Sequence, residues 1–553
     1  MRKARTDPMV RHLRQVLLWP LRLMPAAGTE SAHLKPWEIL AGDTSVWHEV
    51  VDEYDGDVAN FHERHYNEFV TFLPYVQRFL YGEGRTPDNR GNAAPMRVFR
   101  RRDVASVRVV CSDDDAPVTL DVVHIDLYFF HDVDVFMLNV EVRVDDVALS
   151  SAQEVLYRFG RAYPAGWDQA GQPLHCMNSV EWLDAQGGVM AASQTQEKEA
   201  ALLHVWARRT PCFARHWKFV LAPLVHNLED DTGALRYQQI EYYRMPLMAY
   251  LAVDNPRALV RSDFIRLGLV TGKCGGSRAG EDAALPYSDQ HLDDFERQYC
   301  YDRFWTGSGA APHTRYLCSG NAMIVVGDAR SAYFCCRDRG VLAQFRHQHF
   351  LLFMIAHLQK ASLLMLSDRL AEALSGLNIG DADNVRRFKR KIRSSFEGFL
   401  RFTHRYWFHE ISEQAQARAL YRMCRSHLDL ERLHAEVKVR VADMNAYLDA
   451  DSLRRQANTV VRLTVVTIFG LVGTVTTGFL GMNLLAEADT PVARRLWIFG
   501  VTMAVTIAVT TYTMVKSKRL SDFLDALSDE RLSVWVKAKA LLAVWRKGDD
   551  DAR

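Results

Sequence analysis

Two long apolar runs without a formal charge stand out in the hydrophobic pattern near the C-terminus. Residues 463–482 and 496–515 each contain 20 residues and no Asp, Glu, Lys or Arg. A helix of about 20 apolar residues crosses the hydrocarbon core of a bilayer, which is about 30 Å thick. Only residues 483–495 lie between the two runs, so the pattern predicts a hairpin of two transmembrane helices.

The residues before these runs follow a helical period. Sixteen of the 17 prolines lie at or before Pro312, and the last is Pro491, so proline interrupts no helix between them. We expect long helices over residues 341–462. One covers the apolar stretch from Val341, a second covers the basic stretch after residue 384, and a third starts near Ser412.

The third helix carries an apolar seam with steps of three and four residues. If it runs unbroken from Ser412 to residue 483, it is about 105 Å long at about 1.5 Å per residue. Because one chain alone is not expected to cover this seam, the pattern predicts an oligomer. The seam consists of Leu430, Leu433, Val437, Val441, Met444 and Leu448.

The first 340 residues are predicted to form a mixed α/β domain. The segments TLDVVHIDLYFF and DVFMLNVEVRV alternate with a period of two and flank a turn at 131–134, which predicts a β-hairpin. A helix capped by Ser150 or Ser151 is expected next, and residues 236–253 and 316–326 are candidates for further strands. The basic and apolar segment at 10–28 is expected to lie on a surface, since Pro20 and Arg22 interrupt it and make a poor signal peptide.

Composition narrows the function. The net charge of +1 gives no indication of nucleic-acid binding, and the nine scattered cysteines, none in a C-x-x-C motif, are typical of reduced thiols. No catalytic constellation is recognisable, so an enzyme is not expected. The segment GLVTGKCGGS at 268–277 resembles a phosphate-binding loop but is one residue short and has Cys274 in place of Ser or Thr. Cys212 and His216 form a possible metal pair at i, i+4.

The first apolar run has a polar stripe. At 100° per residue, six positions lie within about 40° of one line along the helix. Such a stripe fits a narrow water-lined path and fits helix packing equally well. The stripe comprises Val460, Thr464, Thr467, Leu471, Thr474 and Gly478. Packing is the better interpretation for the second run, where Thr502, Thr506, Thr510 and Thr513 recur at helical spacing.

The C-terminal third resembles the CorA-type magnesium transporter family. The tripeptide Gly481-Met482-Asn483 stands at the end of the first of two C-terminal spans, after a long charged helix and before a short loop, a second span and a basic KSKR segment. The resemblance covers roughly residues 340–520. It implies an α+β fold class with an N-terminal cytosolic α/β domain, a long helical stalk, two transmembrane helices and a homopentameric funnel.

The resemblance also assigns roles to residues. Asn483 would form a ring at the outer mouth and, with Gly481 and Met482, select a hydrated ion. Gly478, Thr474, Leu471 and Thr467 would line the path, and Leu463 or Thr464 with Val460 would form a hydrophobic gate. Glu487 and Asp489 would either concentrate cations outside the filter or only solvate the loop. Acidic residues of the expected cytosolic part, such as Asp113–Asp115 or Asp381 and Asp383, are candidates for regulatory metal contacts, although solvation explains them more simply.

These assignments lead to an expected function and topology. The chain is expected to take up Mg²⁺ down the membrane potential, as a homopentamer in the cell inner membrane with both termini in the cytoplasm and a tail helix over 516–553. Mg²⁺ would be both the transported ion and a regulatory ion. No other cofactor and no nucleic-acid partner is expected. One alternative is a Zn²⁺, Co²⁺ or Ni²⁺ transporter of the same fold. A second is a membrane-anchored sensor or enzyme without transport.

Overall fold

A computed structural model gives the fold and divides the chain into two compact units, Met1–Val441 and Ala442–Arg553. The structure describes residues 7–24, 36–40, 45–50, 62–82, 95–112, 115–131, 133–169, 171–194, 198–228, 235–241, 243–272, 287–375, 382–481, 491–494 and 496–509, with residues 233, 285, 377 and 512.

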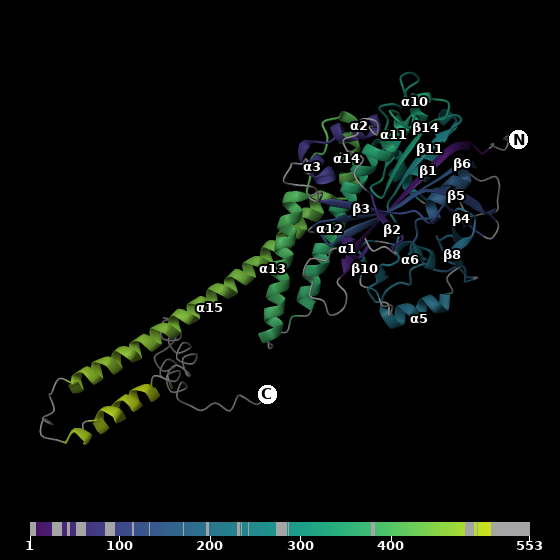
Figure 1. The fold of residues 1–553 in the computed structure, drawn as a ribbon. Coiled ribbons are helices and arrows are strands. Elements are labelled where there is room, and N and C mark those ends of the chain that lie inside the picture. Colours follow the sequence, from purple (N-terminus) through teal and green to yellow (C-terminus); the bar gives the residue numbers. More distant parts are fainter. Residues whose placement is uncertain are drawn as a thin grey trace. The chain divides into compact units, whose positions relative to one another are not determined.

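The first unit is built on one mixed sheet of 14 strands (Figure 1). Its main path runs β12-β13-β14-β11-β1-β6-β5-β4-β7-β8, and β2, β3, β9 and β10 pair off this path. The strands are β1 (Met9–Met24), β2 (Trp47–Glu49), β3 (Met96–Arg101), β4 (Ser106–Val110), β5 (Val118–Phe130), β6 (Val135–Ala148), β7 (Ser179–Leu183), β8 (Val189–Gln194), β9 (Val225–His226), β10 (Arg236–Gln239), β11 (Leu247–Val253), β12 (Cys300–Tyr301), β13 (Arg315–Cys318) and β14 (Ala322–Asp328).

The predicted hairpin and the later strands are confirmed. β5 and β6 pair antiparallel through Phe129 and Phe136, next to the expected turn. The segment 236–253 forms two strands, β10 and β11, and the segment around Cys318 forms the antiparallel pair β13 and β14. With its many helices, the unit has the α+β character that the period-two and helical patterns predict.

The prediction for the N-terminal segment is wrong. Instead of lying on a surface, residues 9–24 form β1, a central strand that pairs with β6 on one side and with β11 and then β10 on the other. Pro20 is tolerated because the β11 ladder ends at Leu17 and the β10 ladder starts at Leu21, so its missing N–H lies between two ladders. An apolar strand buried on both sides has no polar alternation to distinguish it from a surface helix.

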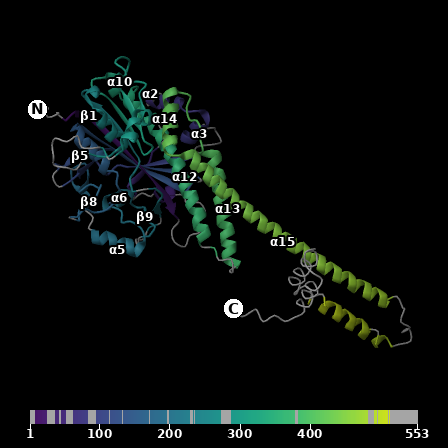
Figure 2. The same cartoon turned by 180° about the vertical axis from the view of Figure 1, so that it is seen from behind.

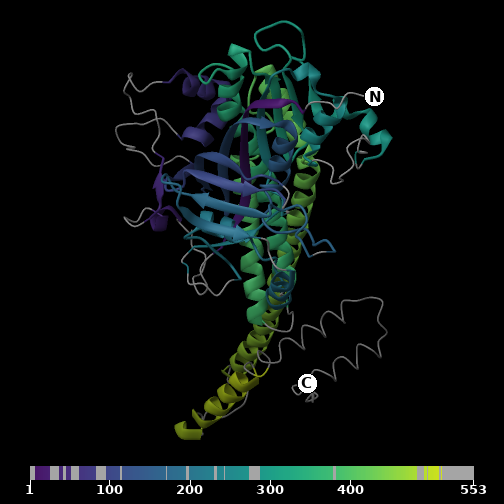
Figure 3. The ribbon, with the colours of Figure 1, turned by 90° about the vertical axis from the view of Figure 1, so that its right-hand side faces the viewer.

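The helices cover both faces of the sheet (Figures 1, 2 and 3). They are α1 (Pro36–Leu40), α2 (Glu63–Thr71), α3 (Pro74–Tyr81), α4 (Leu149–Arg158), α5 (Lys198–Arg208), α6 (Arg215–Leu221), η2 (Pro256–Ala258), α7 (Arg261–Leu269), α8 (Asp289–Asp293), α9 (Phe295–Tyr299), α10 (Ala332–Cys335), α11 (Val341–Gln344), the π-helical turn η3 (Phe345–His349), α12 (Phe350–Ser375), α13 (Ala382–Arg405), α14 (Ala415–His427) and α15 (Leu430–Gly481).

Strand alternation separates two buried layers. Leu13, Leu17, Phe136 and Leu138 belong to an apolar core that also contains residues of α4 and α6. The intervening positions lie on the opposite face, where Arg14 contacts Glu141 and where Arg22 reaches Asp368 of α12. The period of two thus gives one face an apolar core and the other a layer with buried charge.

The predicted long helices are present, with three corrections. The helix from Val341 extends through α11, η3 and α12, but a π turn interrupts it, and the basic helix is α13. The third helix begins at Ala415 rather than near Ser412, and it breaks after His427, where Asp429 has a φ of 54°. The expected continuous helix of 105 Å is therefore replaced by α14 and the 52-residue α15. The N-cap of α4 is Ala148, so the serine cap was also wrong.

The seam on α15 is partly covered by its own chain. Leu430, Val437 and Val441 are at most 3% exposed. His434 on the same helix turns stacks on Phe399 of α13 and on Trp407. The expectation that one chain leaves this seam open was therefore wrong for its first three turns, because α13 and the segment after it pack there.

We predict that β1 is essential for stability. Trp19 is 1% exposed and lies edge-on to Phe213 and Trp217, so Trp19→Ala should destabilise the protein by about 3–5 kcal/mol. Thermal unfolding of the purified full chain measures this as a lower melting temperature. Trp206→Ala on α5 is the matched control, since Trp206 is 73% exposed; equal effects of the two substitutions would contradict the central position of β1.

Candidate functional site

The sequence-predicted stripe lies on the exposed side of α15. Val460, Leu463 and Leu471 are 62%, 66% and 63% exposed, although each is a large apolar residue. The remaining stripe positions with described side chains are also exposed: Thr464, Thr467, Thr474 and Gly478. The structure therefore brings the six stripe residues, with Leu463 beside them, onto one uncovered face of a continuous helix.

The opposite side of α15 faces the second apolar helix. A Cβ atom added at Gly473 would lie 2.7 Å from Cγ2 of Thr506, so the two helices are in close contact there. Between residues 456 and 481, the described side chains with reduced exposure are all at least about 100° around the helix from the centre of the stripe. They are Val461, Val465, Val466, Phe469, Gly473 and Thr477.

The second helix presents threonine to this contact. Ile498, Thr502 and Thr506 are partly buried at a spacing of four residues, whereas their described neighbours are exposed. The packing role predicted for the threonines of the second run agrees with this for Thr502 and Thr506. Thr510 and Thr513 lie outside the described residues.

The stripe threonines have their hydroxyl protons engaged with the backbone. Thr464, Thr467 and Thr474 donate to the carbonyl oxygens of Val460, Leu463 and Gly470 at 2.8–2.9 Å. A hydroxyl that donates inward keeps its lone pairs as acceptors. The stripe thus offers acceptor oxygens among apolar groups, which suits donors such as the water molecules around a cation.

Part of the predicted site falls outside the described residues. Gly481 is the last residue of α15, and Met482, Asn483, Glu487 and Asp489 follow in the segment 482–490 that the structure does not describe. The expected tail helix over 516–553 also lies outside.

Two helices of the described chain have the length and apolar character to cross a membrane. Val341–Ser375 has 83% of its apolar window buried, so it is a core helix of the first unit. Val492–Val509 has a mean hydropathy of 1.6 and none of it is buried, and Gln456–Leu471 of α15 is a shorter apolar stretch. The exposed apolar helices near the C-terminus indicate association with a membrane.

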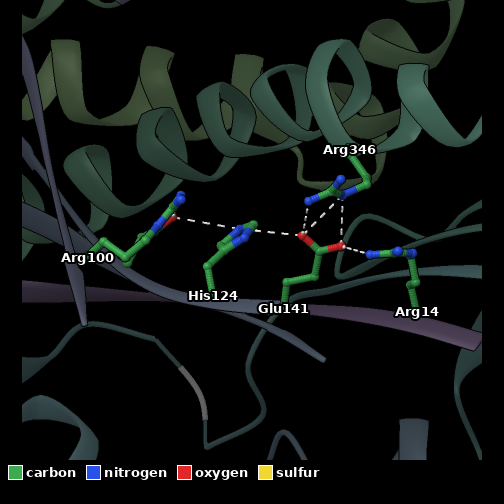
Figure 4. Close-up of polar contacts among 6 residues, drawn as sticks. Arg14, Arg100, His124, Glu141 and Arg346 are labelled. Atoms are coloured by element: carbon green, nitrogen blue, oxygen red, sulfur yellow. Dashed lines mark hydrogen bonds and ion pairs between the residues drawn. The ribbon is translucent and has the colours of Figure 1, made fainter. Parts of the chain in front are cut away.

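A second candidate site is a buried charge network on the α12 face of the sheet. Strand register creates it: Arg100 of β3 lies opposite Asp126 of β5, and His124 of β5 lies opposite Glu141 of β6. Arg14 of β1 and Arg346 of η3 complete the group (Figure 4).

The contacts in this network are short. Arg100 donates to both carboxylate oxygens of Asp126 at 2.7 and 2.9 Å. Glu141 accepts from Arg14 at 2.7 Å and from Arg346 at 3.1 Å, and His124 Nε2 lies 3.4 Å from it. Figure 4 shows Glu141 between Arg14 and Arg346, with His124 on the side of Arg100. Three guanidinium groups thus surround two carboxylates that are at most 3% exposed.

Neighbouring charges control the ionisation of Glu141. Burial alone would raise its pKa, but His124, Arg346 and Arg14 together lower the pKa to about 2. Burial lowers the pKa of Arg14 despite the nearby carboxylate. Glu141 is therefore an anion at neutral pH that ties β1, β6 and η3 together.

Sequence reasoning did not find this network. Its signal was present as charged residues at alternating positions in apolar strands: His124 and Asp126 in VVHIDLYFF, and Glu141 in MLNVEVRV. Such residues point to one face of a strand, but their partners on other strands follow only from register.

The remaining sequence candidates are not brought into sites by the described residues. The group of metal-ligand side chains found among the described residues contains neither Cys212 nor His216. His216 is also buried, with 6% of its surface exposed. Gly268 lies inside α7, so a helix precedes the glycine-rich segment where a phosphate loop requires a strand. Asp115 accepts a hydrogen bond from the Ser112 hydroxyl. Residues 113, 114 and 381 and the side chain of Asp383 lie outside the described residues.

Comparison with known proteins adds no relative. No family model, no curated protein and no solved structure matches this chain.

We predict that protonation of Glu141 lowers the stability of the protein at acidic pH. Its pKa is lowered from 4.5 to about 2, so its contribution is complete above pH 4.5 and is lost as the pH falls toward 2, by about 3 kcal/mol. Glu141→Gln should lower stability at pH 7 by about 3–5 kcal/mol, because it leaves buried guanidinium groups unpaired, and should flatten the decline below pH 4.5.

Melting temperatures between pH 7 and pH 3 measure both effects. Glu181→Gln is the control, since Glu181 pairs with Arg108 at the surface. A variant of Glu141 with wild-type stability and wild-type acid sensitivity would contradict the assigned role.

Proposed function

We propose that the protein is a channel for divalent metal cations, with Mg²⁺ as its principal cargo. One observation carries this proposal: the mixed threonine and apolar stripe occupies the uncovered face of α15, opposite the face that packs on Val492–Val509. A stripe used for packing within the hairpin would face the second helix. The packing alternative left open by the sequence is therefore weakened for contacts within one chain.

A single helix encloses no path, so further copies must supply the other walls. We propose a homopentamer in which α15 of each chain turns its stripe to a common axis, as the resemblance to two-span metal transporters implies. The rings of Val460, Leu463 and Leu471 would close the path by dewetting, and the acceptor oxygens of Thr467 and Thr474 would contact the water shell of a passing ion.

Asparagine is suited to the mouth of such a path. Mg²⁺ gives up its water ligands reluctantly, and a neutral carboxamide can bind those waters without holding the ion too strongly. In this proposal Asn483, with Gly481 and Met482, selects the hydrated ion, and Glu487 and Asp489 raise the local cation concentration.

The proposed driving force is electrical. A divalent ion gains about 4.6 kcal/mol on moving through 100 mV toward the negative side. Basic residues flank the hairpin at Arg454, Arg455, Arg462, Lys516, Lys518 and Arg519. The positive-inside rule favours both ends of the hairpin in the cytoplasm, and we propose that the chain lies in the cell inner membrane and carries an inward Mg²⁺ flux. A Zn²⁺, Co²⁺ or Ni²⁺ cargo, or a sensor without transport, is the alternative that flux measurements distinguish.

Cysteine substitution tests which face of α15 meets water. We predict that a small charged thiol reagent modifies Thr467→Cys and Thr474→Cys in proteoliposomes and reduces flux several-fold. Phe469→Cys, on the side facing the second helix, should react at least about tenfold more slowly. The native cysteines all precede α15, so the unsubstituted chain gives the background. Equal reactivity at residues 469 and 474 would contradict a water-lined stripe.

Asn483→Ala tests the filter. We expect it to abolish the preference for Mg²⁺ over other cations and to lower Mg²⁺ flux about tenfold or more, because the carboxamide acceptors for the hydrated ion are lost. Mg²⁺ entry into dye-loaded proteoliposomes at a fixed membrane potential measures this. Asn458→Ala, at an exposed position of α15, is the matched control. Unchanged flux and selectivity in Asn483→Ala would overturn the filter role.

A further inference from the structure

A cluster of metal-ligand side chains lies beside the buried charge network. His65 and Glu68, three residues apart on α2, meet His347 of the π turn η3. One ligand atom from each of the three lies within 4.8 Å of the others. His347 Nδ1 is 2.9 Å from Glu68 Oε2, and the rings of His65 and His347 are 5.1 Å apart and edge-on.

We propose that these three residues bind a transition-metal ion, with Zn²⁺ as the best-suited class. Two imidazoles and one carboxylate with an open fourth position are ligands that Zn²⁺ and Co²⁺ prefer, whereas Mg²⁺ prefers oxygen ligands. Ligands at about 2.0–2.1 Å from a tetrahedral ion lie about 3.3 Å apart. The observed atoms need to move by about 1.5 Å at most, which side-chain rotation supplies.

The surroundings favour this site. Glu68 is 8% exposed, and Tyr81 donates to its Oε1 at 2.5 Å, so the carboxylate is oriented by a second residue. The Arg64 guanidinium donates to Nε2 of His65 at 3.2 Å, so an ion bound at that nitrogen would replace this hydrogen bond. A neutral imidazole is the form that binds metal.

The cluster lies close to the surface at His347. A surface hollow next to the cluster is lined by His347 together with Arg64, Asn67, Gln344 and Gln348. Water or a small ligand can therefore reach the ion from outside. A π turn is also a frequent feature of functional sites, and here consecutive residues of the turn serve two carboxylates: Arg346 contacts Glu141 and His347 contacts Glu68.

This site is independent of the proposed conduit. Its ligands come from α2 and η3 of the first unit, and no stripe residue contributes. Bound metal would join α2 to the turn whose Arg346 holds Glu141. The chain would then carry a resident ion of a different chemical class from the Mg²⁺ it is proposed to conduct.

The test is metal binding by the purified full chain in detergent after chelator treatment. We expect one Co²⁺ per chain with the visible absorption of a tetrahedral site, displaced by Zn²⁺ but not by excess Mg²⁺. His65→Gln and His347→Gln should each weaken Zn²⁺ affinity about 100-fold in competition with a chromophoric chelator. His409→Gln is the matched control, since that side chain is 70% exposed and outside the cluster.

Two further measurements separate a failure of this metal site from a failure of the proposed conduit or of folding. Asn483→Ala should retain full Co²⁺ binding, so loss of flux and loss of this site are distinguishable. Melting of each variant without metal checks folding, and His65→Gln is the milder change because His347 keeps its contact with Glu68. Absence of a tetrahedral Co²⁺ signal in the wild type, or wild-type affinity in both histidine variants, would show that the cluster is only a hydrogen-bonded group and would overturn the proposal.

Discussion

An apolar helix of membrane length must be covered by something other than water. The free energy of exposing its surface is about 25 cal/mol per Å², which the small net stability of a folded chain does not offset. No residue in the apolar window of Val492–Val509 is fully buried, and α15 exposes large apolar residues such as Leu463 and Leu471. Within the described chain, the contact between the two helices covers only one side of each. Lipid and further copies of the chain are the coverings that remain, and the proposed function starts from that requirement.

The same requirement applies to the stripe of α15, because its hydroxyl oxygens and its apolar groups suit different surroundings. Lipid is a good covering for Leu and Val but a poor one for a row of hydroxyl oxygens, even where the hydroxyl protons are bonded to the backbone. In the proposed assembly, water between several copies solvates the hydroxyl oxygens, and the apolar rings line the path at the places where they can dewet it. In the first unit, buried charged groups are covered by partners within the same chain. Its polar layer is buried, and Glu141 is kept charged there by His124, Arg346 and Arg14, so that a carboxylate under the sheet is matched by partners on three elements.

Sequence patterns predicted the helices and strands whose formation depends on residues close together in the chain. The hairpin β5–β6, the strands around Leu247 and Met323 and the helices α12 and α13 follow local residue patterns. The apolar helices near the C-terminus follow from two uncharged runs of 20 residues. The stripe was also correct as a set of residues on one face, since a helix with a fixed angle per residue leaves no other arrangement. The transported ion and the number of copies stay predictions.

The failures have a common cause in contacts distant along the chain. β1 has no alternation because both of its faces are buried, and its partners start more than 110 residues later. The break at Asp429 and the burial of Leu430 follow no local pattern, and α15 packs on α13 through His434 and Phe399. The charge network and the cluster at His65, Glu68 and His347 join strands and helices whose register no local pattern contains.

The central claim is that the stripe of α15 encloses a water-filled path between copies of the chain. A single-particle structure of the full chain in a lipid nanodisc tests it directly. The account predicts a closed ring of chains in which Thr467, Leu471 and Thr474 face a central aqueous axis and Val492–Val509 lies outside, toward lipid. A structure in which these three residues contact acyl chains, or in which the ring has no axial opening and they are buried between neighbouring helices, would contradict it.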